Sequence, residues 1–263
     1  MMNKVYIRSA ALLSASDEVD FRQYIPPMQA RRMGMLLKRA LVTAKMALSE
    51  AGMDVPGAIV CGTGLGCMET TERILSALRA DGEQGGVSPT DFMQSTHNTI
   101  ASTVALHLGC HGYNCSYSQG DVSFENALMD AFLLVAGGHV GSALVCGNDE
   151  MTEATRERLA QSGYFSPKYE SAGLSVSFVL SSDPSGALCS LESLRLFHGA
   201  VPAATAPVVL EEEDYKALYG ECPVSSAAGM YKAVGMFADG ENGPVQVRNA
   251  SAPDGAIITL AKQ

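Results

Sequence analysis

Short, almost continuous apolar runs alternate with helical patterns along this chain. The clearest runs are "GAIVCGTGLG" (57–66), "SALVCGNDE" (142–150) and "GLSVSFVLSS" (173–182). Such runs are typical of strands that are buried on both faces of a sheet. Between two of them, apolar residues recur at helical spacing at Phe124, Leu128, Ala131 and Val135. Buried strands alternating with helices predict an α/β fold with a largely parallel sheet, covered by helices on both faces.

The remaining segments complete this pattern. Further strands are expected at 4–13, 113–118 and 188–197, and a closing hairpin at 244–261. Helices are expected at 30–51 with Gly52 as C-cap, 68–80, 99–109, from Val122 onward, 211–218 with an acidic cap, and 225–237. The segments 81–89 and 199–208 are expected to be a loop and a connector.

The overall charge excludes two classes of partner. The chain has 263 residues, a net charge of −10 and a pI near 4.9. Nucleic-acid binding and docking on anionic membranes both need an excess of Lys and Arg, so neither is expected. An acidic protein partner stays possible through one local basic cluster, Arg31, Arg32, Lys38 and Arg39.

The cysteines indicate a reducing compartment. Their number is odd, no CxxC pair occurs, and several lie in apolar runs: Cys61, Cys67, Cys110, Cys115, Cys146, Cys189 and Cys222. We expect buried free thiols and no disulfide framework. No metal-type spacing is present, so we expect no metal site. The apolar stretch near the N-terminus is too short to form a membrane-spanning helix. We therefore expect a cytoplasmic protein.

Two motifs allow both a functional and a structural interpretation. The run "GTGLG" (62–66) resembles part of a dinucleotide-binding fingerprint, but Cys67 takes the place of its third glycine. Close packing of strand on helix is favoured, and no cofactor is expected. His97, in "STHN" before a helix, has the chemistry of an acid or base. It can equally hold a turn through a hydrogen bond, and on its own we favour that role.

The corner "SQGD" (118–121) joins a predicted strand to a predicted helix, where many enzymes carry a nucleophile. Asp121 stands where a helix N-cap belongs, and Asp is among the best N-cap residues. Its carboxylate also suits the positive end of the helix dipole. A hydrolase elbow needs GxSxG, which this corner lacks. Capping is therefore sufficient to explain Asp121.

Three long segments carry a family resemblance. They are "RRMGMLLKRALVTAKMALSEAGM" (31–53), "AIVCGTGLGCMETTERIL" (58–75) and the stretch from "DFMQSTHN" to "LVCGNDE" (91–150). In this order they resemble a β-ketoacyl synthase over about residues 3–182. The resemblance implies a thiolase-like α/β/α/β/α layered sandwich with a shortened second half. It implies a ketosynthase-like half at 1–185, and a short half at 186–263 that completes the same domain.

The subgroup most similar is the short chain-length-factor type of aryl-polyene and related pigment biosynthesis, which "YIPPMQARRM" (24–33) resembles. Against the family pattern, the catalytic Cys position falls on Asp121, within one residue, with Ser118 and Gln119 nearby. No Cys lies between Cys115 and Cys146. "CPVSSAAGMYKAVGMF" (222–237) resembles the helix that carries the second catalytic His and has Pro223 there. The stretch with the first His is missing, as is the double glycine of the final strands.

The resemblance and these departures imply a non-catalytic ketosynthase-like subunit that acts with a ketosynthase in polyketide or fatty-acid-like chain synthesis. The partner is a ketosynthase subunit or a second copy, and an acyl carrier protein is a further candidate. Bulky residues would line the acyl tunnel, and the candidates are Phe92, Met93, Phe124 and Met129. Each of the four could equally be an ordinary core residue, and for each we favour that interpretation. One alternative is a residual enzyme, a malonyl-thioester decarboxylase or acyltransferase, using Gln119 and His97. Another is a homodimeric scaffold without an enzyme partner.

Overall fold

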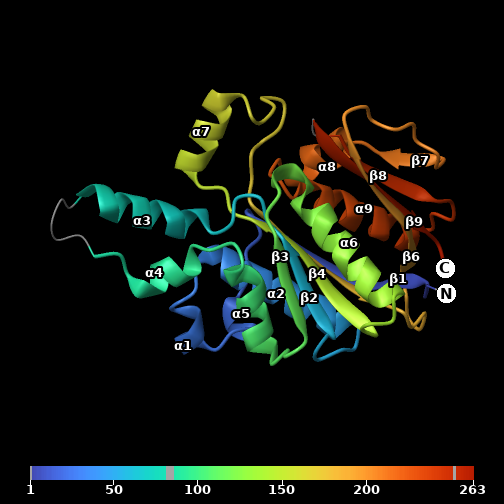
Figure 1. Ribbon diagram of the computed structural model, residues 1–263, viewed down its shortest axis with the longest axis horizontal. Coiled ribbons are helices and arrows are strands. Elements are labelled where there is room, and N and C mark those ends of the chain that lie inside the picture. The colour runs from blue at the N-terminus through green and yellow to red at the C-terminus, as the bar shows by residue number, and fades with distance from the viewer. Residues whose placement is uncertain (1, 81–85, 251–252) are drawn as a thin grey trace.

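Nine strands form one sheet in the computed structural model, which describes residues 2–80, 86–250 and 253–263 (Figure 1). The strands are β1 (Val5–Ser14), β2 (Ala58–Gly62), β3 (Tyr113–Tyr117), β4 (Ser142–Asp149), β5 (Leu174–Ser181), β6 (Cys189–His198), β7 (Val208–Leu210), β8 (Val245–Asn249) and β9 (Asp254–Ala261). Their order is β3-β2-β4-β5-β1-β6-β9-β8-β7. The predicted strands are therefore present.

Six of the nine α-helices in the described residues follow the sequence pattern, one of them with a later start, and three were not predicted. They are α1 (Pro27–Ala30), α2 (Met35–Glu50), α3 (Met68–Ala80), α4 (Pro89–Gln94), α5 (Thr99–Leu108), α6 (Ser123–Ala136), α7 (Glu153–Ser162), α8 (Glu212–Tyr219) and α9 (Ser225–Ala238), with 3₁₀ turns η1 (Phe21–Gln23) and η2 (Gly120–Val122). The helix expected at 30–51 starts later, because Gly34 is its N-cap. Most of the predicted loop 81–89 and the tip of the closing hairpin lie outside the described residues. No described helix has both the length and the hydrophobicity that a membrane span requires.

The sheet is mixed, so the expectation of a largely parallel sheet was wrong. Only β2–β3, β2–β4 and β7–β8 run parallel. β5 is antiparallel to both of its neighbours, β4 and β1, although all of its residues are buried. A strand that is covered on both faces is apolar throughout in either direction, so composition does not report its orientation.

Helices α6 and α9 lie against each other between the two halves of the sheet (Figure 1). α6 packs mainly on β2, β3 and β4, α9 contacts β8 and β9, and both helices also reach β1 and β5. One hydrophobic core surrounds this pair, and a second lies between α2, α5 and the opposite face of the first half. The halves are joined where Val5–Ile7 of β1 pair with Cys189–Leu191 of β6. Residues 189–261 thus supply four strands to a continuous sheet.

The segment 199–207 crosses the face of β8 that points away from α9. Val245 and Val247 belong to the central core, so Gln246 and Arg248 point to the opposite face. The Gln246 side chain accepts from the Thr205 amide (2.9 Å), and Arg248 donates to the Pro202 carbonyl (3.0 Å). An irregular strap, fastened by side-chain hydrogen bonds, therefore covers this part of the sheet.

Candidate functional site

The corner between β3 and α6 is held by a serine that the sequence pattern did not single out. The Ser123 hydroxyl accepts from the Gln119 amide (2.8 Å) and donates to the Gly120 carbonyl (2.6 Å). Gly120 has a φ of 57°, which favours glycine at this tight turn. The N-cap of α6 is Val122, without a side-chain cap. The prediction that Asp121 is the N-cap was therefore wrong, because the 3₁₀ turn η2 moves the helix start past it.

Asp121 faces a polar cavity and is held there by a tyrosine. The Tyr164 hydroxyl donates to Asp121 Oδ1 (3.0 Å), and the Asn249 amide donates to the Asp121 carbonyl (2.6 Å). Burial raises the pKa of Asp121, and the hydrogen bond from Tyr164 opposes that rise. This carboxyl is therefore a hydrogen-bond acceptor anchored between three elements of the fold.

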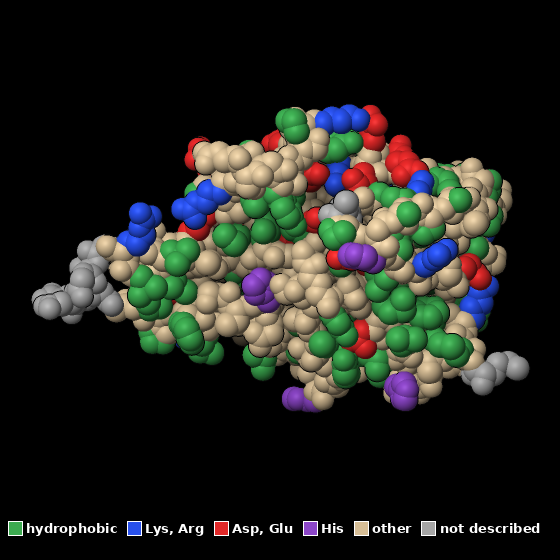
Figure 2. Space-filling view, turned by 45° about the horizontal axis from the view of Figure 1, so that its top comes forward, with side chains coloured by type: hydrophobic (Ala, Val, Ile, Leu, Met, Phe, Trp, Pro, Cys, Tyr) green, Lys and Arg blue, Asp and Glu red, His purple; other side chains and the backbone are tan. Residues whose placement is uncertain are grey.

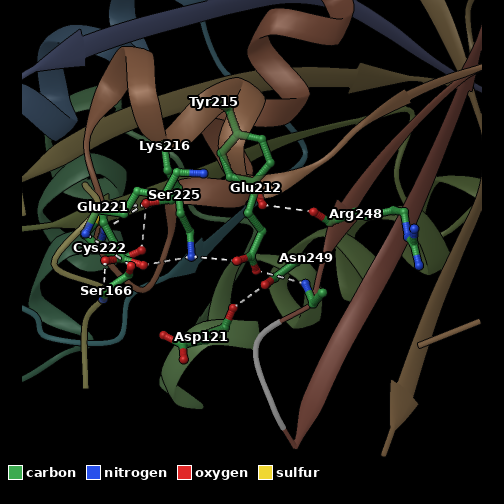
Figure 3. A network of polar contacts seen from close by, with 12 residues as sticks. Asp121, Ser166, Glu212, Tyr215, Lys216, Glu221, Cys222, Ser225, Arg248 and Asn249 are labelled. Atoms are coloured by element: carbon green, nitrogen blue, oxygen red, sulfur yellow. Dashed lines mark hydrogen bonds and ion pairs between the residues drawn. The ribbon is translucent and has the colours of Figure 1, made fainter. Parts of the chain in front are cut away.

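Lys216 and Glu221 line the other side of this cavity, and Lys216 also pairs with Glu212 (Figure 3). Lys216 Nζ lies 3.0 Å from Glu212 and 2.9 Å from Glu221. The second oxygen of Glu221 accepts from the Ser166 amide (2.9 Å). Burial lowers the pKa of Lys216, but the two carboxylates offset this effect and raise it overall. The lysine is thus a cation that is already paired with two carboxylates of the chain.

Pro223 lines the same cavity as Asp121, so the fold brings together the two positions that the resemblance assigns to the family's Cys and second His. Pro223 also packs directly on Gly64: a Cβ added at Gly64 would lie 2.4 Å from the proline Cβ. The cavity has a volume of about 40 Å³, enough for a few water molecules and too small for an acyl chain. No histidine is among its described lining residues.

Glu125, on the first turn of α6, is a buried carboxyl that the sequence pattern did not reveal. Its side chain is fully buried, and Oε1 accepts from the Asn249 amide (2.7 Å). Oε2 has no hydrogen-bond partner among the described residues. Burial raises the pKa of Glu125 to about 7. The only signal in the sequence was a charged residue between the apolar positions Phe124 and Leu128.

Asp149, at the end of β4, organises the glycine-rich loop after β2. Its Oδ1 accepts from the Thr63 hydroxyl (2.7 Å) and from the amides of Gly64 (3.0 Å) and Leu65 (2.8 Å). Burial raises the pKa of Asp149 to about 6, against the effect of these hydrogen bonds. The backbone amides of this loop, which a nucleotide phosphate would need, already donate to the Asp149 carboxylate. The segment "GTGLG" therefore serves packing and loop structure.

Gln119 and Val122 face a different space from Asp121. Both line a groove against the ends of β6 and β9, whereas Ser118 is exposed on the corner. His97 is exposed and packs on Gly66, where an added Cβ would lie 3.2 Å from the imidazole Cδ2. His97 lines neither the groove nor the Asp121 cavity. The fold therefore does not place His97 beside Gln119.

The four tunnel candidates are placed in three different environments. Phe124 is fully buried in the central core, 5.8 Å from the ring of Phe178. Met129 is half-buried on α6. Phe92 and Met93 are 65% and 71% exposed on α4. The core interpretation thus holds for Phe124, whereas Phe92 and Met93 contribute to no core within the described chain.

The cysteines and the basic cluster have structural settings of their own. All seven cysteines are free thiols, and six of them are buried, as expected.

Arg31, Arg32 and Lys38 line an open groove of about 490 Å³ between α2 and α4. Arg39 does not line this groove and instead donates a hydrogen bond to the Ala15 carbonyl (2.6 Å). Within the described part of the chain, no group of three His, Cys, Asp or Glu is arranged to hold a metal ion.

Residues 8–208 match the family model of the β-ketoacyl synthase N-terminal domain. The chain belongs to this family. One curated relative, 3-oxoacyl-[acyl-carrier-protein] synthase 2 of Synechocystis sp., is 27% identical over 158 residues. That match covers 57% of this chain and 36% of the relative, so the chain spans about a third of the curated relative it matches.

Solved structures of ketosynthases have the same fold. The ishigamide ketosynthase/chain length factor matches with a TM-score of 0.80 at 13% identity, over 98% of this chain and 99% of that one. A complex of a ketosynthase with its chain length factor from Xenorhabdus doucetiae matches with a TM-score of 0.65 at 16% identity, over 98% and 99%. A β-ketoacyl synthase from Burkholderia phymatum matches with a TM-score of 0.74 at 13% identity, over all of both chains. The thiolase-like layered fold expected from the resemblance is confirmed.

Proposed function

We propose that this protein is a non-catalytic ketosynthase-like subunit of the chain-length-factor type. It would act with a ketosynthase in the synthesis of polyketide or fatty-acid-like acyl chains. The observation that carries this proposal is the start of α6, where neither Val122 nor Asp121 is a cysteine. The family's reaction uses a thiolate at a helix N-terminus, where the dipole favours the ionised form.

Neither residue at this corner can replace that thiolate. Val122 has no nucleophilic group. Asp121 is held by Tyr164 over a cavity of about 40 Å³ that admits no acyl chain. A carboxylate is also a poor nucleophile towards a thioester, and it repels the carboxylate of a malonyl group. Pro223, at the degenerate histidine position, has no side-chain proton to exchange.

A projecting arm and an exposed strand edge support pairing with a second subunit. Helices α3 and α4 extend from the body as an arm (Figure 1). Hydrophobic side chains gather on this arm (Figure 2), and four large ones are 47% to 71% exposed: Leu75, Leu78, Phe92 and Met93. Strand β3 is the edge of the described sheet, so one side of its backbone has no partner strand there. Both features are typical of a subunit interface.

We propose that Phe92 and Met93 enter the acyl tunnel of the partner ketosynthase and limit chain length. Their exposure on the arm supports this role, because a side chain can line another subunit's tunnel only if it is not buried in its own subunit. Phe124 is excluded from it by its place in the central core. The structures of a ketosynthase with its chain length factor are relatives in fold, and aryl-polyene synthesis is the pathway that the sequence resemblance favours.

An acyl carrier protein is the proposed second partner. Carrier proteins are acidic, and this chain, at −10, needs a local basic site to receive one. The groove with Arg31, Arg32 and Lys38 provides it, since these three have no ion-pair partner among the described residues. We also propose a cytoplasmic location, which the seven free thiols support.

The first test is co-purification with a ketosynthase from the same organism. We expect a 1:1 complex that Met93→Glu disrupts, because a charge on an apolar contact must be desolvated. Complex formation is measured by the mass of the species that elutes. The matched control is Leu218→Glu, which changes a 63% exposed leucine on α8 and is expected to leave the complex intact.

Product length separates the tunnel role from pairing alone. Phe92→Ala and Met93→Ala should keep the complex and lengthen the acyl products, because smaller side chains leave a longer tunnel. A wild-type protein that stays a homodimer in the presence of the ketosynthase would contradict the proposal and favour the homodimeric scaffold.

The carrier-protein site is tested separately on the intact complex. Replacing Arg32 by Glu should weaken carrier-protein binding at least tenfold at low salt, and this effect should shrink as salt is added. Binding is measured by titration of the carrier protein. Arg158→Glu, on the exposed face of α7, is the control for total charge. Equal weakening by both variants would show that net charge, not this groove, governs binding.

A further inference from the structure

The groove beside the β3–α6 corner is a candidate site distinct from the Asp121 cavity. It has a volume of about 510 Å³ and lies between Gln119, Val122 and Asn126 on one side and residues 196–198, Asp254 and Gly255 on the other. Its apolar surface comes from Val122, Leu196 and Phe197. The Phe197 ring lies directly over Gly255, since a Cβ added at this glycine would be 2.4 Å from the ring. The groove is thus large enough for a small organic ligand, unlike the cavity.

A histidine and an aspartate stand together at this groove. His198 ends β6, Asp254 begins β9, and the two are directly opposed in the antiparallel register. His198 Nδ1 lies 2.7 Å from Asp254 Oδ1. The carboxylate therefore holds the proton on Nδ1 and leaves Nε2 as the basic nitrogen. Nε2 has no hydrogen-bond partner among the described residues.

An amide at the corner supplies a donor to the same groove. The Gln119 backbone N–H is committed to Ser123, but its side-chain amide has no hydrogen bond within the described chain. The Asn126 amide, in contrast, donates to the Val122 carbonyl (2.8 Å). Gln119 is therefore the side chain on this wall that is free to donate to a ligand oxygen.

The charges that line the groove select the class of ligand. His198 and Asp254 are the only titratable side chains among its described lining residues, and they form a pair. No Lys or Arg of the described lining compensates a ligand anion, and Asp254 repels one. An uncharged molecule with an apolar part and a carbonyl oxygen fits this combination of apolar wall, amide donor and basic nitrogen.

We propose that this groove hydrolyses uncharged activated acyl compounds, thioesters or esters with a short apolar acyl group. His198 Nε2 takes a proton from water as the water oxygen bonds to the acyl carbonyl carbon. The Gln119 amide donates to the oxyanion that forms. The tetrahedral species then expels the thiolate or alkoxide, which takes the proton from Nε2, and the carboxylic acid leaves. Asp254 is a positioning residue, which orients the imidazole through its contact with Nδ1.

The test uses the purified wild-type chain and two probes, the hexanoyl thioester of N-acetylcysteamine and p-nitrophenyl hexanoate. Release of thiol or nitrophenol is followed at pH 7.5. We expect His198→Gln to lower the rate about 100-fold and Gln119→Ala at least tenfold. Asp254→Asn should lower kcat about tenfold with little change in KM, a separation that a merely structural role would not produce.

His111→Gln, prepared in the same way, is the control for an exposed histidine and for contaminating esterases, and should equal the wild type. Hydrolysis of one probe alone would still support the site and identify the leaving group that it takes. A wild-type protein that hydrolyses both probes no faster than His198→Gln overturns the proposal. This hydrolysis is not the condensation that the proposed subunit lacks, and it does not require a partner ketosynthase, so it is separable from the pairing proposed above.

Discussion

Replacing Gly62 by alanine is expected to lower the free energy of unfolding by roughly 3 kcal/mol or more. Gly62 ends β2 beneath the start of α6. A Cβ at this position would lie 2.5 Å from the Ser123 carbonyl oxygen and 2.6 Å from the Phe124 backbone. All of these are backbone atoms, so no side chain can rotate away to make room. The helix that carries the corner must move off the strand, and the loss is measured by denaturant unfolding.

Two other glycines serve as matched controls. Gly141 and Gly235 have open space where a Cβ would be added, and neither has a positive φ. Gly141→Ala should change stability by no more than about 0.5 kcal/mol. Gly235→Ala, within α9, should raise it by up to about 1 kcal/mol because alanine favours the helix. A Gly62→Ala protein as stable as Gly141→Ala would show that α6 does not pack on the backbone of β2.

Features that depend on local sequence pattern, such as strands, helices and helix caps, could be predicted from the sequence. The alternation of apolar runs with helical periods indicated nearly all strands and six of the nine described α-helices, but not α1, α4 or α7. The acidic run at 211–214 predicted a cap that the structure shows as a capping box between Glu211 and Asp214. The start of α2 was missed although Gly34 signals it. The helical spacing of apolar residues from Met33 onward led to a predicted helix that included residues 31–34. These residues form a turn instead.

Contacts between distant segments could not be predicted in the same way. Asn249 bonds Glu125 across 124 residues, and His198 meets Asp254 only because β6 and β9 pair in that register. The corner at 118–121 was found because a strand, a glycine and a helix are adjacent in sequence. Which of its side chains faces which space depends on η2, whose single turn directs Asp121 to the cavity and leaves Val122 at the groove.

Replacing Glu125 by glutamine is expected to stabilise the protein at pH 8 by roughly 2–3 kcal/mol. Burial raises the pKa of Glu125 from 4.5 to about 7, so the folded protein binds this proton more tightly than the unfolded chain does. Between these two values the folded state holds more protons, and stability therefore falls as pH rises. Above pH 7 the folded state bears a buried carboxylate that accepts a hydrogen bond from Asn249.

The comparison with pH 5 separates this cause from other effects of the substitution. At pH 5 Glu125 is protonated in the folded state, so the glutamine variant should differ little from the wild type. The quantity to measure is the difference in unfolding free energy between the two proteins at pH 5 and at pH 8. This difference cancels other carboxyls that titrate alike in both proteins, such as Asp149.

Glu157→Gln, on the exposed face of α7, is the control for removing one negative charge from an acidic chain. It should give the same small difference at both pH values, since an exposed carboxylate keeps its hydration in the folded state. A Glu125→Gln protein that is less stable than the wild type at pH 8 would contradict the expectation. It would mean that the ionised carboxylate, paired with Asn249, stabilises the contact between α6 and the end of β8 more than its burial costs.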